Sequence, residues 1–380
     1  LGGNGGTVAF ADLNITTTNG QGLNVGAINF APATSPNINA TGGTALTMNG
    51  TTSDVTFGSV IATDAGAGNA AISLTNLQNI TLSGVQVSGT TGTGILANNV
   101  NSLSLSNPTI DGTTGNAITA TNTGLSLISG NIGTNFAIGG DGVVVNNTDA
   151  ISRTFSVSNA NFGTGALDIT GRGIVLNSTG SGTLTANLNS TQIHSGGAAL
   201  LTTDSGTAKQ LVLNIGTTGD MQFARSSSGF AVSVTGSGLN STIVQSLGAT
   251  TSNISVGGTA NGGGVLFNRV TFDGSGAALS GTQAGTGNWT IGTPGNRVQG
   301  DGLRFDGPSG DLLFNSMNIA NDNGTGLYVD TKTLGTAFSL ATTNPASVDT
   351  TNGSALFLDP LTVNMTFSGL SSTNSGTNGI

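Results

Sequence analysis

The chain has 380 residues, of which 36% are apolar and only 7% are charged, and it contains 63 glycines and no cysteine. Its formal net charge is −9, and all 17 acidic residues are aspartate. Phosphate binding needs clustered cations, so these values argue against a nucleic-acid partner. The lack of cysteine excludes disulfides and thiolate metal sites, and no apolar run approaches the roughly 18 residues of a transmembrane helix.

A short motif recurs along the chain: Gly or Ala, then apolar–x–apolar, and usually Asn, Thr or Asp. Its thirteen copies begin at positions 22, 45, 71, 94, 117, 142, 173, 199, 231, 264, 302, 326 and 355. Successive starts lie 23 to 38 residues apart, and 23 is the commonest step. A base unit that tolerates insertions indicates a repeat architecture. We therefore expect one elongated domain over residues 1–380, in which each coil contacts its neighbours.

The copy that spans residues 94–116 shows how one coil is built. Residues 95–97 and 103–105 read as extended segments, and a third short segment follows at 109–110. Alternation is typical of strands, and the Asn, Gly and Asp-Gly between the segments favour turns. Strands this short pair with the equivalent strands of the next coil, through right-handed connections. The sequence therefore predicts an all-β fold, a right-handed parallel β-helix (solenoid) of about 13 coils with roughly 23 residues each plus loop insertions.

The scarcity of charge follows from this fold. Each outward residue would lie about 4.8 Å from its counterpart in the next coil. Two like charges at that distance repel by roughly 0.9 kcal/mol even in water. Thr, Ser and Asn avoid this repulsion, and we expect them to form hydrogen bonds along the stack.

The motif, together with the segments NITLSGVQVSG (79–89) and NSLSLSNPTIDG (101–112), resembles the right-handed β-helices of the pectate-lyase-like superfamily. In composition the chain is most similar to the passenger domains of autotransporters and to other large bacterial surface proteins. The resemblance covers nearly the whole chain but implies architecture only. Function has to be argued from a site.

Polygalacturonase-like members of that superfamily carry Asn-Thr-Asp-Gly, a paired Asp, Gly-His-Gly and a basic triplet. Here Asn147-Thr148-Asp149 is followed by Ala150, there is no Asp-Asp, and the one histidine, His194, lies between Ile and Ser. We therefore expect Asp149 to be a turn residue and His194 to be a solvated surface residue. No catalytic residue is predicted.

One column of the repeat changes character toward the C-terminus. The fourth residue after each start is mostly Asn or Thr, but it is Asp306, Asp330 and Asp359 in the last three copies. Stacking in register would bring these carboxylates within about 5–7 Å of one another. Oxygen ligands suit Ca²⁺, so a calcium site is one outcome. Three solvated turn aspartates are the other.

The second residue after each start is expected to point outward. It is polar in most of the early copies, but several copies place an apolar residue there, at Val144, Val175, Leu201, Leu266 and Phe357. An outward apolar stripe must be covered by a loop of the same chain, a neighbouring subunit or a ligand. The same column places Arg304 beside Tyr328, which predicts a cation–π contact.

The longer insertions lie between about 200 and 300, and the longest, near 274–300, contains the only tryptophan. Loops on a rigid scaffold often carry binding residues. Trp289, Arg297, Asp301, Arg304 and Tyr328 are therefore candidate ligand-binding residues, with a sugar as the ligand. In the alternative interpretation, Trp289 packs against the wall of the solenoid.

These observations favour a non-catalytic, extracellular structural or adhesive protein of the cell surface. We expect it to self-associate or to contact other surface components, with no cofactor other than possible calcium. The chain begins at Leu1 and shows no capping element, so we expect a longer chain or a filament. One alternative is a polysaccharide-binding or polysaccharide-cleaving β-helix that uses the 200–300 loops. Another is a viral tailspike that forms a trimer along the apolar stripe.

Overall fold

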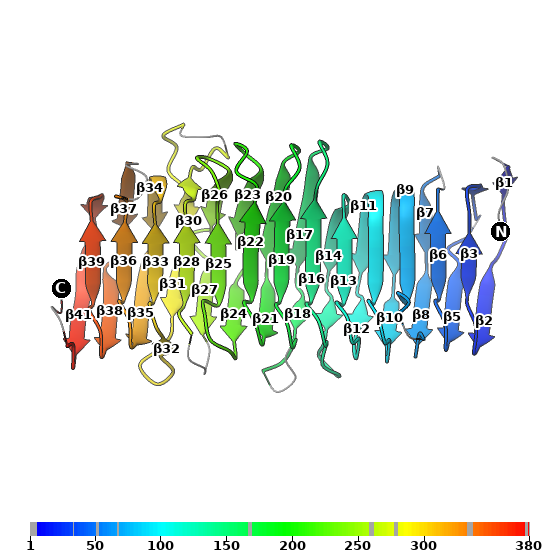
Figure 1. Cartoon of the computed structure of the whole chain (residues 1–380), viewed down its shortest axis with the longest axis horizontal. Coiled ribbons are helices and arrows are strands. Elements are labelled where there is room, and N and C mark those ends of the chain that lie inside the picture. The colour runs from blue at the N-terminus through cyan, green and yellow to red at the C-terminus, as the bar shows by residue number, and fades with distance from the viewer. Residues whose placement is uncertain are drawn as a thin grey trace. The chain divides into compact units, whose positions relative to one another are not determined.

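The computed structural model describes residues 6–32, 34–50, 53–66, 68–165, 169–257, 262–276, 280–332, 337–376 and 379, and none of them is helical. The chain divides into two compact units, residues 1–175 and 176–380, which are described separately. In each unit, short parallel strands stack coil upon coil (Figure 1). Each unit is therefore a parallel β-solenoid, consistent with the right-handed parallel β-helix that the sequence predicts. The expectation of one domain over residues 1–380 stays a prediction.

Each of the thirteen repeat starts is followed at once by a strand, and these strands form the first stack. In the N-terminal unit the first stack contains β3 (Leu23–Val25), β6 (Leu46–Asn49), β9 (Ile72–Ser83), β11 (Ile95–Ser106), β13 (Ile118–Thr121) and β16 (Val143–Asn147). β19 (Ile174–Ser178) lies at the unit boundary. In the C-terminal unit it contains β22 (Leu200–Asp204), β25 (Val232–Thr235), β28 (Val265–Asn268), β33 (Leu303–Asp306), β36 (Leu327–Asp330) and β39 (Leu356–Asp359).

The second stack follows the first within each coil. In the N-terminal unit it is formed by the second halves of β9 and β11 together with β7 (Val55–Phe57), β14 (Gly124–Ile128) and β17 (Arg153–Ser158). In the C-terminal unit it is formed by β20 (Leu184–Asn189), β23 (Leu211–Ile215), β26 (Thr242–Leu247), β29 (Thr271–Phe272), β30 (Gly285–Thr286), β34 (Ser309–Phe314), β37 (Phe338–Thr342) and β40 (Thr362–Asn364).

The third stack completes each coil. In the N-terminal unit it contains β2 (Asn14–Thr18), β5 (Asn37–Thr41), β8 (Ser59–Thr63), β10 (Val85–Ser88), β12 (Thr109–Ile110), β15 (Asn131–Ile132) and β18 (Asn161–Phe162). In the C-terminal unit it contains β21 (Thr191–Ser195), β24 (Met221–Arg225), β27 (Asn253–Gly257), β31 (Asn288–Ile291), β35 (Ser316–Asp322), β38 (Ala346–Thr351) and β41 (Phe367–Thr373). Three short strands complete the set: β1 (Thr7–Val8) pairs with β4 (Asn29–Phe30), and β32 (Val298–Gln299) pairs with β35.

The coil of residues 94–116 has the three extended segments that the sequence predicts. The first two belong to one long strand, β11, which bends at Asn99, and the third is β12. At this corner φ is 54°, and Asn76 and Asn122 form the equivalent corners of adjacent coils, with φ values of 54° and 49°. Asparagine tolerates this left-handed conformation better than other non-glycine residues. This tolerance explains why Asn recurs there.

The core lies inside the coils. In the N-terminal unit Ile72, Ile95 and Ile118 lie in register and are fully buried. In the C-terminal unit the core becomes aromatic: the rings of Phe267 and Phe305 stack with centroids 5.5 Å apart. Stacking of like residues on like residues produces a continuous apolar interior within each unit.

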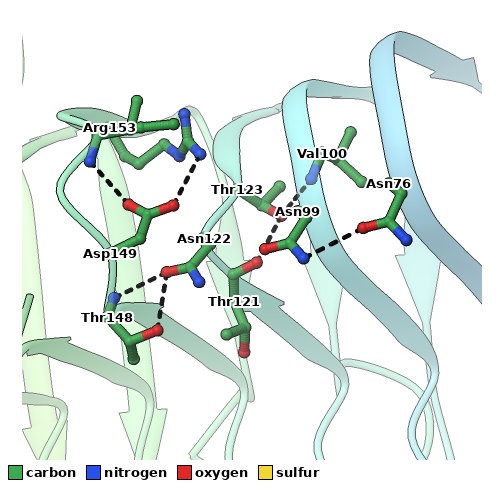
Figure 2. Close-up of polar contacts among 10 residues, drawn as sticks. Asn76, Asn99, Val100, Thr121, Asn122, Thr123, Thr148, Asp149 and Arg153 are labelled. Atoms are coloured by element: carbon green, nitrogen blue, oxygen red, sulfur yellow. Dashed lines mark hydrogen bonds and ion pairs between the residues drawn. The ribbon is translucent and has the colours of Figure 1, made fainter. Parts of the chain in front are cut away.

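Polar side chains form hydrogen bonds from coil to coil, as the sequence predicts. At the corners, Asn99 Nδ2 donates to Asn76 Oδ1 at 3.2 Å (Figure 2). One coil farther on, Asn122 Oδ1 accepts hydrogen bonds from the amide and the hydroxyl of Thr148, at 2.7 and 3.0 Å. These bonds satisfy turn groups without adding charge.

Longer amide ladders run between the first and second stacks of the N-terminal unit and between the second and third stacks of the C-terminal unit. In the N-terminal unit Asn101 Nδ2 donates to Asn79 Oδ1 at 2.9 Å, and Asn79 Nδ2 donates to Asp54 Oδ1 at 3.0 Å. The C-terminal unit holds a five-membered ladder with Nδ2-to-Oδ1 distances of 3.3, 3.4, 2.7 and 3.1 Å. Its members, in chain order, are Asp220, Asn253, Asn288, Asn315 and Asn344. Both ladders begin with an aspartate.

The segment 274–300 differs from the single long insertion that the sequence suggests. It contains β30, β31 and β32, so it is part of the coil structure rather than one loop. The strands leave two shorter connections, at 273–284 and 292–297. The alternation of Asn288-Trp289-Thr290-Ile291 fits a strand with Trp289 and Ile291 facing inward, because both side chains are fully buried.

Candidate binding surface

Four side chains of the predicted outward column lie side by side in the C-terminal unit. The pairing of β28, β33, β36 and β39 places Leu266, Arg304, Tyr328 and Phe357 in register. Arg304 Cζ lies 4.4 Å from the centroid of the Tyr328 ring, which confirms the predicted cation–π contact. The rings of Tyr328 and Phe357 stack with centroids 4.6 Å apart and an interplanar angle of 10°. We call Arg304, Tyr328 and Phe357 the aromatic ladder.

Two carboxylates fix the arginine of the aromatic ladder. Arg304 Nε donates to Asp306 Oδ2 and Nη1 donates to Asp301 Oδ2, both at 2.9 Å. Burial lowers the pKa of Arg304, but the hydrogen bonds and charges of Asp306 and Asp301 outweigh it, so the pKa is raised. Burial also raises the pKa of Tyr328, so the phenol stays neutral at physiological pH. The aromatic ladder therefore combines an arginine that is fixed by two carboxylates with two stacked aromatic rings.

The aspartate column stacks in register, as the sequence predicts. Asp306 pairs with Asp330, and Asp330 pairs with Asp359, across β33, β36 and β39. Cations neutralise its two ends: Arg304 binds Asp306, and Lys332 Nζ forms an ion pair with Asp359. The hydrogen bond from Lys332 to Asp359 raises the pKa of the amine, and the Lys332 backbone amide donates to Asp330 Oδ1 at 2.9 Å.

The geometry therefore favours neutralisation of the column by protein cations over a shared calcium ion. Within the described ranges, no group of three or more Asp or His side chains is arranged to hold a metal ion. Calcium binding by Asp306, Asp330 and Asp359 stays a prediction without a ligand cage to support it.

Trp289 is placed differently from the predicted sugar-binding loop. It lies on β31, its side chain is 0% exposed, and its indole Nε1 donates to the backbone oxygen of Leu247 at 2.8 Å. Its ring meets Phe314 edge to face at 6.0 Å. A fully buried indole offers no face to a sugar. Trp289 faces the core from a strand of the coil and does not pack from an insertion against the outer wall of the solenoid, as the alternative interpretation expects.

Arg297 also has a structural role. Its Nη2 forms an ion pair with the carboxylate of Asp349, and its Nη1 donates to the backbone oxygens of Asp349 and Asn321, at 2.7 and 3.3 Å. The guanidinium thereby ties the connection before β32 to the third stack. Of the five predicted ligand-binding residues, the structure brings together Asp301, Arg304 and Tyr328 only.

The predicted assembly stripe is interrupted. Val144 and Val175 are only 8% and 1% exposed, so neither is available to a partner subunit. Leu201 and Leu266 are half-buried, and Phe357 is 41% exposed. Burial of the two valines agrees with the interpretation that the chain covers its own outward apolar residues. Phe357 is the member of the stripe that remains most accessible.

Asp149 and His194 both have structural rather than catalytic surroundings. Asp149 accepts hydrogen bonds from the backbone amide of Ile151 at 2.9 Å and from Arg153 Nη2 at 3.2 Å, which is the predicted turn role (Figure 2). His194 is half-buried on β21. The neighbouring Ser195 is 1% exposed and donates to the Gly197 oxygen at 3.0 Å. Adjacent residues of a strand face opposite sides, so Ser195 and His194 do not form a nucleophile–base pair.

Sequence reasoning missed a polar groove on the third stack of the C-terminal unit. A cavity of about 630 Å³ lies over β21, β24 and β27. It is lined by Ser190, Gln192, Gly219, Asp220, Met221, Gln222, Asn253 and Ser255. Gln192, Gln222 and Ser255 lie in register. Alignment of the third strands of successive repeats, rather than the first alone, would have revealed this polar column.

No protein-family model matches the chain, and no curated protein or solved structure is significantly similar to it. Among the described residues, no helix is long and apolar enough to cross a membrane. The assignment of a β-solenoid therefore depends on the strands and their register alone.

Proposed function

We propose that this chain is a non-catalytic, extracellular structural or adhesive protein, akin to autotransporter passengers and other large bacterial surface proteins of the pectate-lyase-like β-helix architecture. Its contact surface is the aromatic ladder. The observation that carries this proposal is an ordered Arg–Tyr–Phe stack on the outside of a scaffold whose other outward positions are mostly uncharged and polar.

The ladder has the chemistry of a protein contact. Arginine and tyrosine are enriched among the residues that dominate binding energy at interfaces. Asp301 and Asp306 already hold Arg304, and the three side chains stack on one another, so little conformational entropy remains to be lost on binding. Phe357 supplies the exposed apolar area.

The proposal predicts self-association through the ladder, and sedimentation velocity of the full chain tests it. The double variant Tyr328→Ser, Phe357→Ser is expected to shift the protein toward monomer. Leu96→Ser is the matched control, because Leu96 occupies the same outward column in the N-terminal unit and is 37% exposed. A wild-type chain that stays monomeric at its solubility limit, or equal association of the two variants, would overturn the proposal.

The polar groove favours a second candidate function, the binding of a neutral polysaccharide. Gln192 and Gln222 are exposed and lie one coil apart, so each presents an amide donor and acceptor to a hydroxyl-rich ligand. On a glycan array, binding that disappears in Gln192→Ala, Gln222→Ala but persists in Tyr328→Ser, Phe357→Ser would support this function. New reducing ends released from a bound glycan would indicate cleavage and contradict a non-catalytic protein.

A further inference from the structure

The first stack of the C-terminal unit presents two different halves on its outer face. Its strands β22, β25, β28, β33, β36 and β39 lie side by side in parallel register (Figure 1). The last three of these strands carry the aromatic ladder. The first three carry Leu201, Ser233 and Leu266 at the same outward position, and all three residues are half-buried. One half of the face is therefore aromatic, and the other half is mainly aliphatic.

The corner that follows the first stack is basic in the aliphatic half. Lys209 and Arg269 are exposed there, and among the described residues neither takes part in an ion pair. The acidic residue of the same corner, Asp204, is 8% exposed. Its carboxylate already accepts hydrogen bonds from Thr242 Oγ1 at 2.5 Å and from the Ser237 amide at 2.8 Å. The charge that this half offers to a partner is therefore positive.

The same corner is acidic in the aromatic half, where the aspartate column lies. The three aspartates of the column are half-buried. Together with Asp301 they outnumber the two cations of this half, Arg304 and Lys332, so negative charge remains in excess. Two copies that stacked ladder on ladder would bring these like charges together. Contact between the acidic half of one copy and the basic half of another brings opposite charges together instead.

We propose that the two halves bind each other across a two-fold axis in an antiparallel pair of copies, an inference that rests on the proposed self-association. The axis runs along the strands, between β28 and β33, so the partner's coils run in reverse order while positions along each strand still match. The opposed residues are Phe357 and Leu201, Tyr328 and Ser233, and Arg304 and Leu266. Each of these contacts occurs twice in such a pair. The aspartate column of each copy lies along the corner of the other copy that carries Lys209 and Arg269.

Charge reversal tests this pairing by sedimentation velocity of the full chain. The first variant, Lys209→Asp, Arg269→Asp, makes the basic corner acidic, and the second, Asp330→Lys, Asp359→Lys, makes the acidic corner basic. Each variant alone should associate about tenfold more weakly than the wild type, because every reversed contact occurs twice. An equimolar mixture of the two should recover the association, since both contacts of a mixed pair are again complementary.

The two variants shift the net charge of −9 in opposite directions, so overall repulsion cannot weaken both. Stronger association of the second variant would indicate a net-charge effect alone and overturn the pairing. Unchanged association of the first variant would also overturn it but would leave the proposed function, because ladder-on-ladder contact does not use Lys209 or Arg269. A monomeric wild type would overturn both. If the lysine substitutions perturb the circular dichroism spectrum, Asp330→Asn, Asp359→Asn removes the charges at constant size and should still weaken association severalfold.

Single cysteines locate the two-fold axis, because the chain has no cysteine of its own. Asn268 ends the strand beside the axis, so along the solenoid it lies one strand spacing, about 4.8 Å, from its counterpart in the partner. Thr203, on β22, lies five spacings, about 24 Å, from its counterpart. A short bis-maleimide that spans the roughly 10 Å between packed sheets should therefore cross-link Asn268→Cys to itself but not Thr203→Cys. Equal cross-linking of the two variants, or no cross-linking of Asn268→Cys where the wild type associates, would contradict the antiparallel pairing.

Discussion

Replacing Trp289 gives the sharpest test of the C-terminal unit. The indole lies on β31 between Ile254 of β27 and Met317 of β35, both of which are buried, and it donates to the Leu247 oxygen at 2.8 Å. Trp289→Ala removes the whole ring from a fully buried position. Trp289→Phe retains an aromatic ring but removes the donor.

The contacts of Trp289 determine how much free energy of unfolding each variant should lose. Truncation of a buried tryptophan to alanine costs about 3–5 kcal/mol, because a cavity remains where the ring was. Trp289→Phe removes one of two hydrogen bonds to the Leu247 oxygen, which still accepts from the Gly287 amide at 3.0 Å, so the lost bond should cost about 0.5–1.5 kcal/mol. The free energy of unfolding should therefore fall in the order wild type, Trp289→Phe, Trp289→Ala.

Urea unfolding followed by far-UV circular dichroism measures these differences, since both variants lack the only tryptophan and cannot be followed by its fluorescence. Phe357→Ala is the control, because Phe357 is 41% exposed and its truncation should cost less than about 1 kcal/mol. If Trp289→Ala unfolded at the same urea concentration as Phe357→Ala, the indole would not be a core residue and the reasoning would fail.

Three further predictions follow from the same contacts. Asn99→Ala should be less stable than Asn99→Gly by about 1 kcal/mol in thermal or urea unfolding, because both lose the bond to Asn76 but only alanine is strained at a φ of 54°. Arg304→Met should lower the free energy of unfolding by about 1 kcal/mol at low salt and by less in 1 M NaCl, since the guanidinium is partly exposed and its ion pairs are screened. In the folded protein the pKa of Asp273 lies below its ordinary value of 3.8, so the ionised carboxylate stabilises the fold above that pH. This contribution is lost as the pH falls further. Asp273→Asn should therefore flatten the dependence of stability on pH below about pH 4, measured by acid titration followed by circular dichroism.

Much of the fold could be predicted from one repeated motif. The Gly or Ala that starts each copy precedes a strand every time, because the apolar–x–apolar pattern places two side chains inside a coil. Register then follows from the motif itself, since equivalent residues must stack to keep the core continuous. That register was sufficient to place Arg304 beside Tyr328, which is a contact between residues 24 positions apart in sequence.

The predictions are wrong where the repeat motif does not determine whether a residue is buried or exposed. The departure of its coil from the base length predicts a loop at Trp289, although the alternation of Trp289 with Ile291 indicates a strand. Val144 and Val175 follow the outward position of the motif, yet they are buried. Both lie in uninterrupted apolar triplets, a pattern typical of strands covered on both faces.

The candidate surfaces were less predictable than the coils. The polar groove depends on the alignment of third strands, whose spacing from the first varies with each insertion. Such contacts follow from three-dimensional register rather than from a local pattern.

The aspartates that begin the amide ladders influence which way the side-chain amides of the asparagines point. An asparagine amide can be turned either way, so a ladder made of Asn alone has two arrangements of equal hydrogen-bond count. A carboxylate has no donor, and Asp220 therefore forces Asn253 to present its NH₂ group, which in turn exposes an oxygen to Asn288, and so on to Asn344. Asp220 thus orients the array from one end, and the Thr250 backbone oxygen, which accepts from Asn288 and Asn315 Nδ2 at 3.4 and 3.3 Å, orients its middle. Aligned hydrogen bonds of this kind polarise one another. Asp220→Asn would remove one of these two constraints and leave the array pointing the same way.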